Sequence, residues 1–253
     1  MTETAQEITD AARVLAALDL VTAYGHVSAR AGDHLLITPA ALLGGIRDTD
    51  LIRVPLDATA LPPGAPGESW LHLSIYARRP DVGAIVRAQP PAALPIAAVT
   101  TALLPLHGQG CWLGRSVPVH DDARLLRERA LADAAAETLG AGAALLLRGN
   151  GAATTATSPG LAVARMWLLS ATCQAWLSAA ASGSVRSLTD AEIDAWQAAE
   201  GDLLPRLWRY LQGKATADTD PDASLRPAGT GDASRRRGPA GAACRAKNRP
   251  PRR

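Results

Sequence analysis

The sequence predicts a layered α/β domain, because candidate strands and amphipathic helices alternate along the chain instead of falling into separate blocks. The chain has 253 residues, of which 47% are hydrophobic and 20% charged, as in a globular protein with a sizeable core. An apolar run at 143–147 is typical of a central strand. We therefore expect one folded domain over residues 1–213, followed by a tail at 214–253.

The first third of the chain is expected to begin with a helix whose apolar residues form a broad stripe. Gly25 ends that helix, and Gly32-Asp33 is a plausible tight hairpin between two short strands. A loop rich in Pro and Gly leads into the next helix. The predicted elements are a helix at 9–24, strands at 27–30, 34–38 and 51–56, and a helix at 68–77.

The remaining elements follow the same mixed order. Ser158 is a suitable N-cap and Pro159 a suitable first residue for a long helix, and a final amphipathic helix should be interrupted near Pro205. Residues 149–151 are predicted to form a turn. The predicted elements are a strand ending at 88, a helix at 92–99, a strand at 117–119, a helix at 123–139, a strand at 143–147, and helices at 158–181 and 189–210.

Charge is distributed unevenly, although the net charge is only +2. Nine Arg or Lys and four Asp fall within residues 215–253. Pro, Gly and like charges without apolar periodicity are typical of disorder, so we expect a disordered basic tail. Such a tail is either a nonspecific contact for nucleic acid or acidic surfaces, or an unselected terminus. The second interpretation is favoured, and nucleic acid is not an expected partner.

No targeting signal is visible in the sequence. The acidic N-terminus lacks the basic start and apolar run of a secretory signal, and no apolar stretch reaches the roughly 20 residues that span a bilayer. Cys111, Cys173 and Cys244 have no spacing typical of a zinc site or a disulfide framework. We expect a cytoplasmic protein without a membrane partner.

Three short motifs contain the candidate catalytic residues. Glu68 and His72 are four residues apart on a predicted helix and share a face. A strand ends in Arg87-Ala88-Gln89-Pro90-Pro91, and Gly149-Asn150-Gly151 follows a later strand. Over about residues 8–185, these motifs resemble the class II aldolase/adducin family. In that family the strand reads His-x-His-Pro-Pro, the later motif ends His-Gly, and the three histidines hold a divalent metal, usually zinc.

The resemblance implies a specific fold and assembly. The fold would be a three-layer αβα sandwich with a central, mostly antiparallel sheet flanked by helices. The family is usually a homotetramer with active sites between neighbouring subunits. The glutamate at the Glu68 position is the family's acid/base.

The metal positions of the family read Arg87, Gln89 and Asn150 here. A guanidinium stays protonated and offers only donors, so Arg87 cannot coordinate a cation. The amide carbonyls of Gln89 and Asn150 suit hard ions but would lie beside a positive charge. We therefore predict no catalytic metal and no other cofactor.

The phosphate-binding positions of the family have also changed. Sugar-phosphate aldolases carry Gly-Asn-x-Ser, Thr-Pro-Ser/Thr-Gly and a Ser-Ser pair before the glutamate. The matching residues here are Gly25-His26-Val27-Ser28, Thr38-Pro39-Ala40-Ala41 and Pro66-Gly67, which lack most of those donors. A small non-phosphorylated carboxylate or carbonyl compound is the expected substrate. Its candidate binding residues are His26, Ser28, Thr38, His72 and His107.

The predicted function is that of a metal-independent lyase. Glu68 would exchange a proton, while Arg87, Gln89 and Asn150 would bind a carboxylate or a developing oxyanion. The residues leave open whether the reaction is C–C cleavage, decarboxylation or a related rearrangement.

Other interpretations remain open for the same residues. One alternative is a non-catalytic, adducin-like binding or scaffold protein, in which Glu68 and Arg87 only fill a vacated site. For His72 the alternative role is that of a packed, hydrogen-bonded histidine. A metal site rebuilt from Glu68 and His72 with His107 or His120 is a third alternative. An open polar cleft at Glu68 and Arg87 would favour an enzyme.

Overall fold

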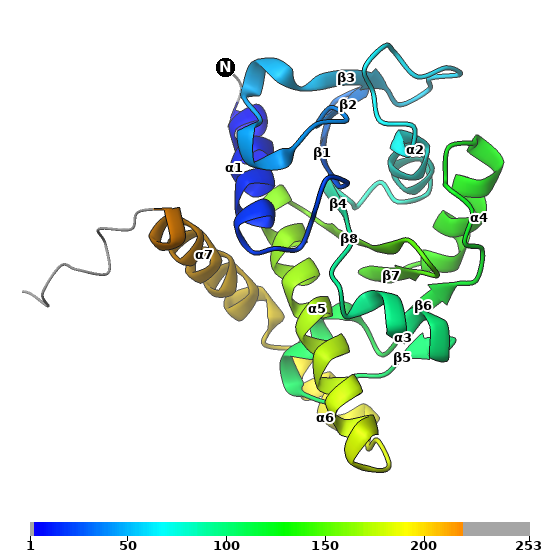
Figure 1. Ribbon diagram of the computed structural model, residues 1–253, viewed down its shortest axis with the longest axis vertical. Coiled ribbons are helices and arrows are strands. Elements are labelled where there is room, and N and C mark those ends of the chain that lie inside the picture. Colours follow the sequence, from blue (N-terminus) through cyan, green and yellow to red (C-terminus); the bar gives the residue numbers. More distant parts are fainter. Residues whose placement is uncertain (1–2, 220–253) are drawn as a thin grey trace, which may run out of the picture.

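The computed structural model describes residues 3–219 and forms a three-layer αβα sandwich around one sheet (Figure 1). The strand order is β3-β2-β1-β4-β8-β7-β6-β5, and every neighbouring pair is antiparallel except the parallel pair β6 and β7. The predicted fold is therefore confirmed. The strands are β1 (His26–Ala31), β2 (His34–Ile37), β3 (Ile52–Pro55), β4 (Ala84–Ala88), β5 (Ala102–Leu103), β6 (Val117–His120), β7 (Ala144–Leu147) and β8 (Gly151–Ala156).

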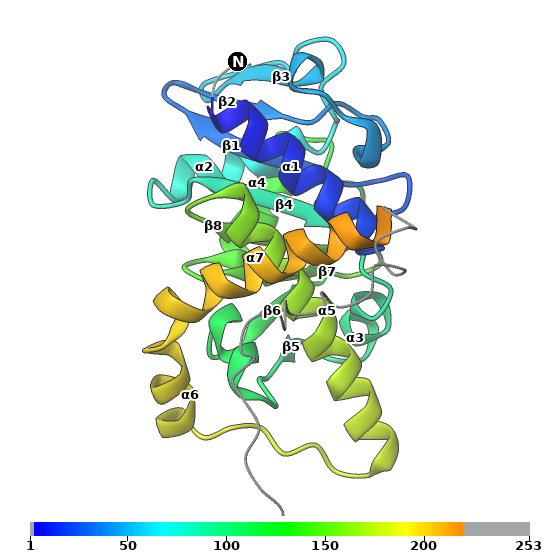
Figure 2. The ribbon, with the colours of Figure 1, turned by 90° about the vertical axis from the view of Figure 1, so that its left-hand side faces the viewer.

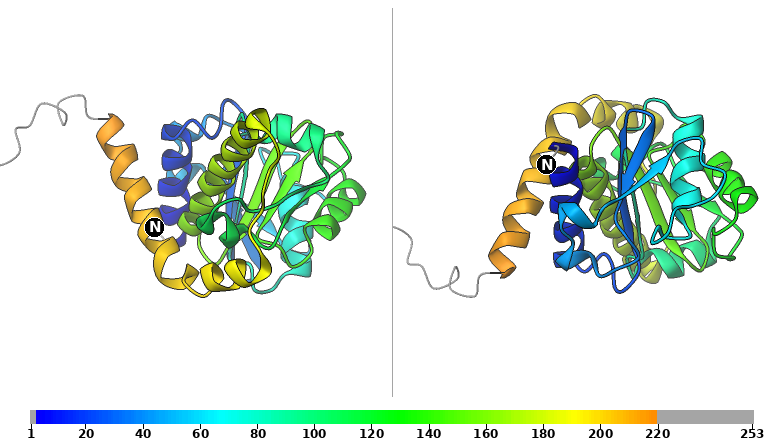
Figure 3. Two further views of the ribbon diagram at one scale, coloured as in Figure 1. Left: turned by 90° about the horizontal axis from the view of Figure 1, so that it is seen from below. Right: turned by 90° about the horizontal axis from the view of Figure 1, so that it is seen from above.

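Helices cover both faces of the sheet, as the two end-on views in Figure 3 show. One face carries α1 (Glu3–Ala17), α3 (Ala93–Val99), α5 (Pro159–Ser182) and α7 (Glu200–Thr219). The other carries α2 (Ser69–Arg78) and α4 (Arg129–Leu139). Figure 2 shows α7 lying across α1 and α5. The short helix α6 (Asp190–Gln197) and three 3-10 turns, Leu43–Gly45, Asp48–Asp50 and Gly108–Leu113, complete the described chain.

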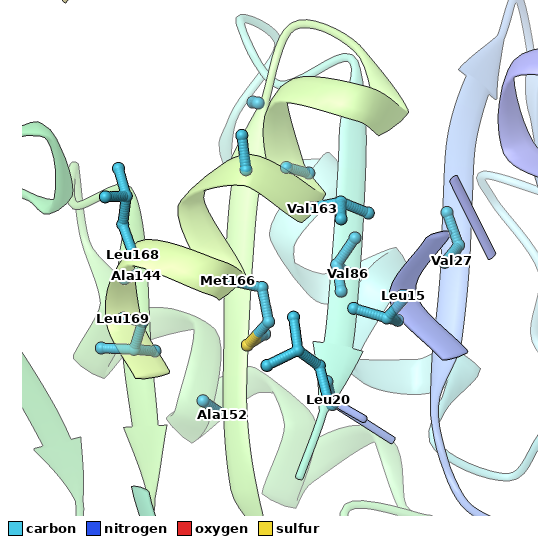
Figure 4. Close-up of a cluster of buried hydrophobic side chains, with 14 of the residues drawn as sticks. Leu15, Leu20, Val27, Val86, Ala144, Ala152, Val163, Met166, Leu168 and Leu169 are labelled. Carbon is cyan, nitrogen blue, oxygen red and sulfur yellow. The ribbon is translucent and has the colours of Figure 1, made fainter. Parts of the chain in front are cut away.

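Alternation along the strands divides the core into two clusters. Val86 of β4 belongs to the cluster under α1 and α5, where Leu15 and Met166 also pack (Figure 4). Its neighbour Ile85 packs in the cluster under α2 and α4. Because successive side chains of a strand point to opposite faces, Arg87 lies on the α2 and α4 side. This alternation places the polar residues of β1 and β4 on one face.

The N-terminal helix differs from the prediction. It spans Glu3–Ala17, whereas the sequence pattern predicts 9–24. Asp19 adopts a left-handed conformation with φ of 53°, which is incompatible with continuing the helix. Leu20 and Val21 are nevertheless buried, so their apolar character reflects core packing outside the helix.

The C-terminal helical region also differs. The interruption lies at 198–199, between α6 and α7, and Pro205 is inside α7. The two helices are separate because α6 packs against the 3-10 turn at 108–113, while α7 packs against α1 and α5. Helix α7 continues to Thr219, past the predicted domain boundary at 213, and the remainder of the predicted tail lies outside the described residues. No helix within residues 3–219 is both long and apolar enough to cross a membrane.

Candidate active site

The site forms where β1, β4, the start of α2 and the turn before β8 meet. His26 on β1 lies directly opposite Arg87 on β4 in the antiparallel register. Glu68 is the residue immediately before α2. The turn holds Asn150 over the end of β4, because Gly151 has φ of 87° and a Cβ there would overlap the Ala88 carbonyl oxygen.

Glu68, Arg87, Gln89 and Asn150 form one polar network. The Glu68 Oε2 atom lies 3.0 Å from Arg87 Nε, and Glu68 Oε1 accepts a hydrogen bond of 2.7 Å from Asn150 Nδ2. Asn150 Oδ1 accepts hydrogen bonds from Arg87 Nη2 and from Gln89 Nε2, the latter 3.2 Å long. Arg87 Nη2 also donates to the Asn150 backbone carbonyl at 3.1 Å. The four predicted catalytic residues are thus brought together.

Arg87 retains unused donor capacity in this network. Its Nη1 atom is buried without a hydrogen-bond partner, and its Nε–H contacts Glu68 without hydrogen-bond alignment. The side chains of Arg87 and Glu68 are only 2% and 8% exposed. Burial lowers the pKa of Arg87, while the Glu68 carboxylate opposes that shift. Because buried donors are normally satisfied, Arg87 is suited to receive an acceptor from a ligand.

His26 supplies a neutral ring beside the carboxylate. Its Nε2 atom lies 3.9 Å from Glu68 Oε2, and its Nδ1 atom has no hydrogen-bond partner. Burial, and then the charge of Arg87, lower the pKa of His26 to about 3. The imidazole is therefore uncharged at neutral pH.

His72 and Ser28 lie behind the site rather than in it. His72 Nδ1 is 2.7 Å from Ser28 Oγ, which is 2.9 Å from the Tyr76 hydroxyl. Burial lowers the pKa of His72 well below its usual value and raises that of Tyr76. The His72 ring meets the His26 ring edge-on at 6.3 Å. These residues support His26 from behind, which matches the alternative of a packed His72.

An open cavity of about 440 Å³ lies in front of the network. Its polar floor contains the four network residues and His26, and its wall is largely apolar. Tyr24 and Leu125 in the wall are 66% and 50% exposed. The wall consists of Ala23, Tyr24, Gly25, Ala40, Ala41, Pro66, Gly67, Leu125 and Arg127.

The other predicted binding residues do not line this cavity. Thr38 Oγ1 accepts a hydrogen bond from the Val27 amide within the sheet. His107 Nδ1 accepts from the Gly110 amide at 3.3 Å, and its Nε2 lies 3.0 Å from Thr172 Oγ1 on α5. His107 therefore caps the turn at 108–113, on the α5 side of the molecule.

The rebuilt metal site is not assembled in the described part of the chain. His120 Nδ1 lies 3.1 Å from Thr138 Oγ1 on α4, away from the Glu68 carboxylate. Residues 3–219 contain no group of three His, Cys, Asp or Glu side chains placed to hold a metal ion. The resemblance implies histidine ligands at the positions of Arg87, Gln89 and Asn150. Here the Arg87 guanidinium lies beside the other two side chains and donates a hydrogen bond to Asn150 Oδ1. This donor set does not fit a divalent cation.

Tyr24, Leu125 and Arg127 belong to no motif that marks them as site residues. The sequence pattern places Tyr24 in a helix and predicts a helix throughout 123–139, whereas α4 begins only at Arg129. Leu126 is buried between Leu125 and Arg127, and in this irregular, non-helical segment both of its neighbours line the cavity.

Comparisons with known proteins agree with this architecture. Residues 6–177 match the family described as Class II Aldolase and Adducin N-terminal domain. The chain is 30% identical over 204 residues to 3,4-dihydroxyphthalate decarboxylase of Arthrobacter keyseri, covering 72% of this chain and 82% of that protein. It is 40% identical over 85 residues to 5-methylthioribulose-1-phosphate/5-deoxyribulose-1-phosphate aldolase of Rhodospirillum rubrum, but this match spans 32% of this chain and only 38% of that aldolase.

A solved structure shows the same fold. L-fuculose 1-phosphate aldolase superposes with a TM-score of 0.72 at 22% sequence identity, covering 78% of this chain and 96% of that chain. Together with the family match over residues 6–177, this shows that the chain belongs to the class II aldolase and adducin family.

Proposed function

We propose that this protein is a metal-independent lyase that breaks a carbon–carbon bond in a small, non-phosphorylated carboxylic acid. The observation that carries this proposal is the buried guanidinium of Arg87, which lines an open cavity beside Glu68 and keeps one nitrogen unpaired. A carboxylate or a developing oxyanion is the natural acceptor for such a donor. Among the possible lyase reactions we place decarboxylation first, since a relative matched over 82% of its length is 3,4-dihydroxyphthalate decarboxylase.

The cavity wall lacks the hydroxyl side chains that bind phosphate in the sugar-phosphate aldolases, which supports a non-phosphorylated substrate. Ala40, Pro66 and Gly67 stand at the matching hydroxyl positions, and Ala41 stands at the glycine position beside them. Their side chains provide no hydrogen-bond donor. A phosphoryl group placed against this wall would lose hydration without direct compensation from those side chains.

Glu68 is the proposed proton carrier. When a carboxylate leaves as CO₂, the electron pair of the broken bond stays on the substrate carbon, and an acid must deliver a proton there. Glu68 is the carboxyl group on the cavity floor, and Asn150 and Arg87 orient both of its oxygens. Glu68 takes that proton from water in the open cavity before the step and is left as the carboxylate that pairs with Arg87, while His26, 3.9 Å away, stays uncharged throughout.

Asn150 acts mainly by orienting Glu68 in this proposal. Its Nδ2 already donates to Glu68, and its Oδ1 accepts from Arg87 and Gln89. The amide thus differs from the oxyanion donor that the sequence suggested. Gln89 uses its amide nitrogen toward Asn150 in one hydrogen bond, which leaves a second N–H for the substrate.

Metal independence is supported by the chemistry of the replaced ligands. Arg87 places a fixed positive charge where the resemblance implies a metal cation. Electrostatic repulsion between the guanidinium and a metal ion opposes metal binding at this place. The guanidinium takes over part of the charge stabilisation as a hydrogen-bond donor. No step in the proposed reaction uses a metal or another cofactor.

The test is a CO₂-release assay on a panel of small aromatic and aliphatic carboxylic acids, with protein freed of metal by a chelator. We expect turnover of at least one acid that is unchanged by chelation and falls about 100-fold or more in Glu68→Gln, as for loss of a general acid. Glu137→Gln on the exposed face of α4 is the matched control. Turnover that requires added metal, or that survives in Glu68→Gln, would refute the mechanism.

A non-catalytic, adducin-like scaffold is the second candidate. The observation that favours it is that both Glu68 oxygens already contact protein groups, as in an ion pair that merely fills a site. A scaffold predicts no turnover of any acid on the panel, with or without added metal. The homotetramer implied by the resemblance is compatible with both candidates.

A further inference from the structure

The cavity wall carries a second guanidinium, that of Arg127, which the described protein does not neutralise. The lining contains one carboxylate, Glu68, and two guanidinium groups, Arg87 and Arg127. Glu68 is paired with Arg87, and His26 is neutral at pH 7. Within residues 3–219, no acidic side chain forms an ion pair with Arg127, which is exposed at the cavity. The cavity therefore has one uncompensated positive charge.

Packing fixes the place of Arg127 relative to the catalytic carboxylate. Leu126 is 1% exposed and anchors the segment, and the Arg127 amide donates to the Leu125 carbonyl at 2.8 Å. A Cβ built on Gly67 would lie 3.0 Å from Arg127 Cγ and 3.2 Å from its Cδ. The stem of Arg127 thus runs along the backbone of Gly67, the residue immediately before Glu68.

We infer that the site takes a small planar dicarboxylate, with one carboxylate at Arg87 and the other at Arg127. This inference rests on the proposed function and names its substrate class. Arg87, beside Glu68, holds the group at the reacting end, whereas Arg127 binds the group that does not react and acts as a specificity-determining residue. Tyr24 and Leu125 offer apolar surface on the same wall for a flat unsaturated body that carries both groups.

A phosphate monoester has the same charge as a dicarboxylate and would also be attracted to Arg127. The apolar positions at Ala40, Ala41 and Pro66 provide no side-chain donors for its additional oxygens. A dicarboxylate needs only the two guanidinium groups, with the unpaired Nη1 of Arg87 at one carboxylate and the bidentate fork of Arg127 at the other. The dicarboxylate is therefore the better fit.

The experiment is calorimetric titration of the full chain with three probes: benzoate, phthalate and glycerol phosphate. We expect phthalate to bind at least about fivefold more tightly than benzoate, equivalent to a partly exposed ion pair of about 1 kcal/mol, and glycerol phosphate to bind more weakly than phthalate. Arg127→Gln should bring phthalate to the affinity of benzoate and leave benzoate unchanged. Arg124→Gln is the matched control, because Arg124 is paired with Asp122 and does not line the cavity.

A second variant separates position from charge. Gly67→Ala keeps both arginines but pushes the Arg127 stem off the backbone, so it should also reduce the preference for phthalate. The inference is overturned if Arg127→Gln weakens both acids equally or neither, if glycerol phosphate binds best, or if neither acid binds at millimolar concentration. Since binding needs no turnover, failure here is distinguishable from failure of the proposed lyase, which the Glu68→Gln assay tests separately.

Discussion

Glu68 and Arg87 form a buried ion pair, with 3.0 Å between Oε2 and Nε, at the floor of an open cavity. Removing two charges from water costs several kcal/mol per ion, and the attraction between them offsets that cost only when the remaining polar atoms are also bonded. Asn150 meets part of this need at Glu68, but Arg87 Nη1 remains without a partner. A site that leaves a buried donor unpaired is organised for a ligand more than for stability.

Truncating one member of the pair should destabilise the fold more than truncating both. Arg87→Met leaves Glu68 buried and uncompensated, at a cost of about 3–5 kcal/mol in the free energy of unfolding. The double variant Arg87→Met/Glu68→Gln should regain most of the free energy of unfolding that Arg87→Met loses. Urea denaturation of the two variants and the parent measures it, with Arg53→Met on the surface as control. Equal losses in the single and double variants would show that the charges are not coupled.

Stability should fall as the pH is lowered from about 6.5, because His26 resists protonation in the folded state. Its pKa is lowered to about 3 when folded, against 6.5 as its ordinary value, and the pKa of His72 is also lowered. Between these values the unfolded chain binds protons that the folded chain does not, so stability rises with pH across this window.

Replacing His26 by Asn removes one group that binds a proton only in the unfolded chain. The slope of the free energy of unfolding against pH should therefore fall by at most about 1.4 kcal/mol per pH unit. The measurement is the urea midpoint of parent and variant at intervals from pH 4 to pH 7. An unchanged slope in the variant would mean that His26 titrates normally in the folded protein.

Gly151→Ala should disturb the site through the backbone. The residue has φ of 87°, and its Cβ would overlap the Ala88 carbonyl, so the turn carrying Asn150 must move. Gly32→Ala is a matched control, with φ of 69° and open space around its Cβ, and should cost only about 1–2 kcal/mol of left-handed strain. Gly151→Ala should lower the midpoint of thermal unfolding and the affinity for phthalate more than Gly32→Ala does. Similar behaviour of the two variants would contradict the role of this close approach.

Residue patterns were sufficient to predict that these four polar side chains lie together, but not what surrounds them; their catalytic roles stay a prediction. Glu68, Arg87, Gln89 and Asn150 stand at motif positions, and the sheet brings them together as the resemblance implies. His72 shares a helix face with Glu68, but that face packs against β1, where Ser28 engages His72. Four-residue spacing on a helix does not distinguish a cavity from the core behind it.

Strand β8 was not predicted from the sequence, although it lies between β4 and β7 near the centre of the sheet. Its residues, Gly-Ala-Ala-Thr-Thr-Ala, are small and buried on both faces, so they show no apolar and polar alternation. The position of Arg127 depends likewise on contact with the distant Gly67, which no local pattern records.

Elemental mass spectrometry of untagged protein, purified without chelator, tests the central claim most directly. The claim is that the guanidinium of Arg87 has taken the place of a metal at the catalytic centre. It predicts well below one transition-metal ion per chain in protein that retains turnover. About one zinc, manganese or iron per chain, lost together with turnover on chelation, would contradict it.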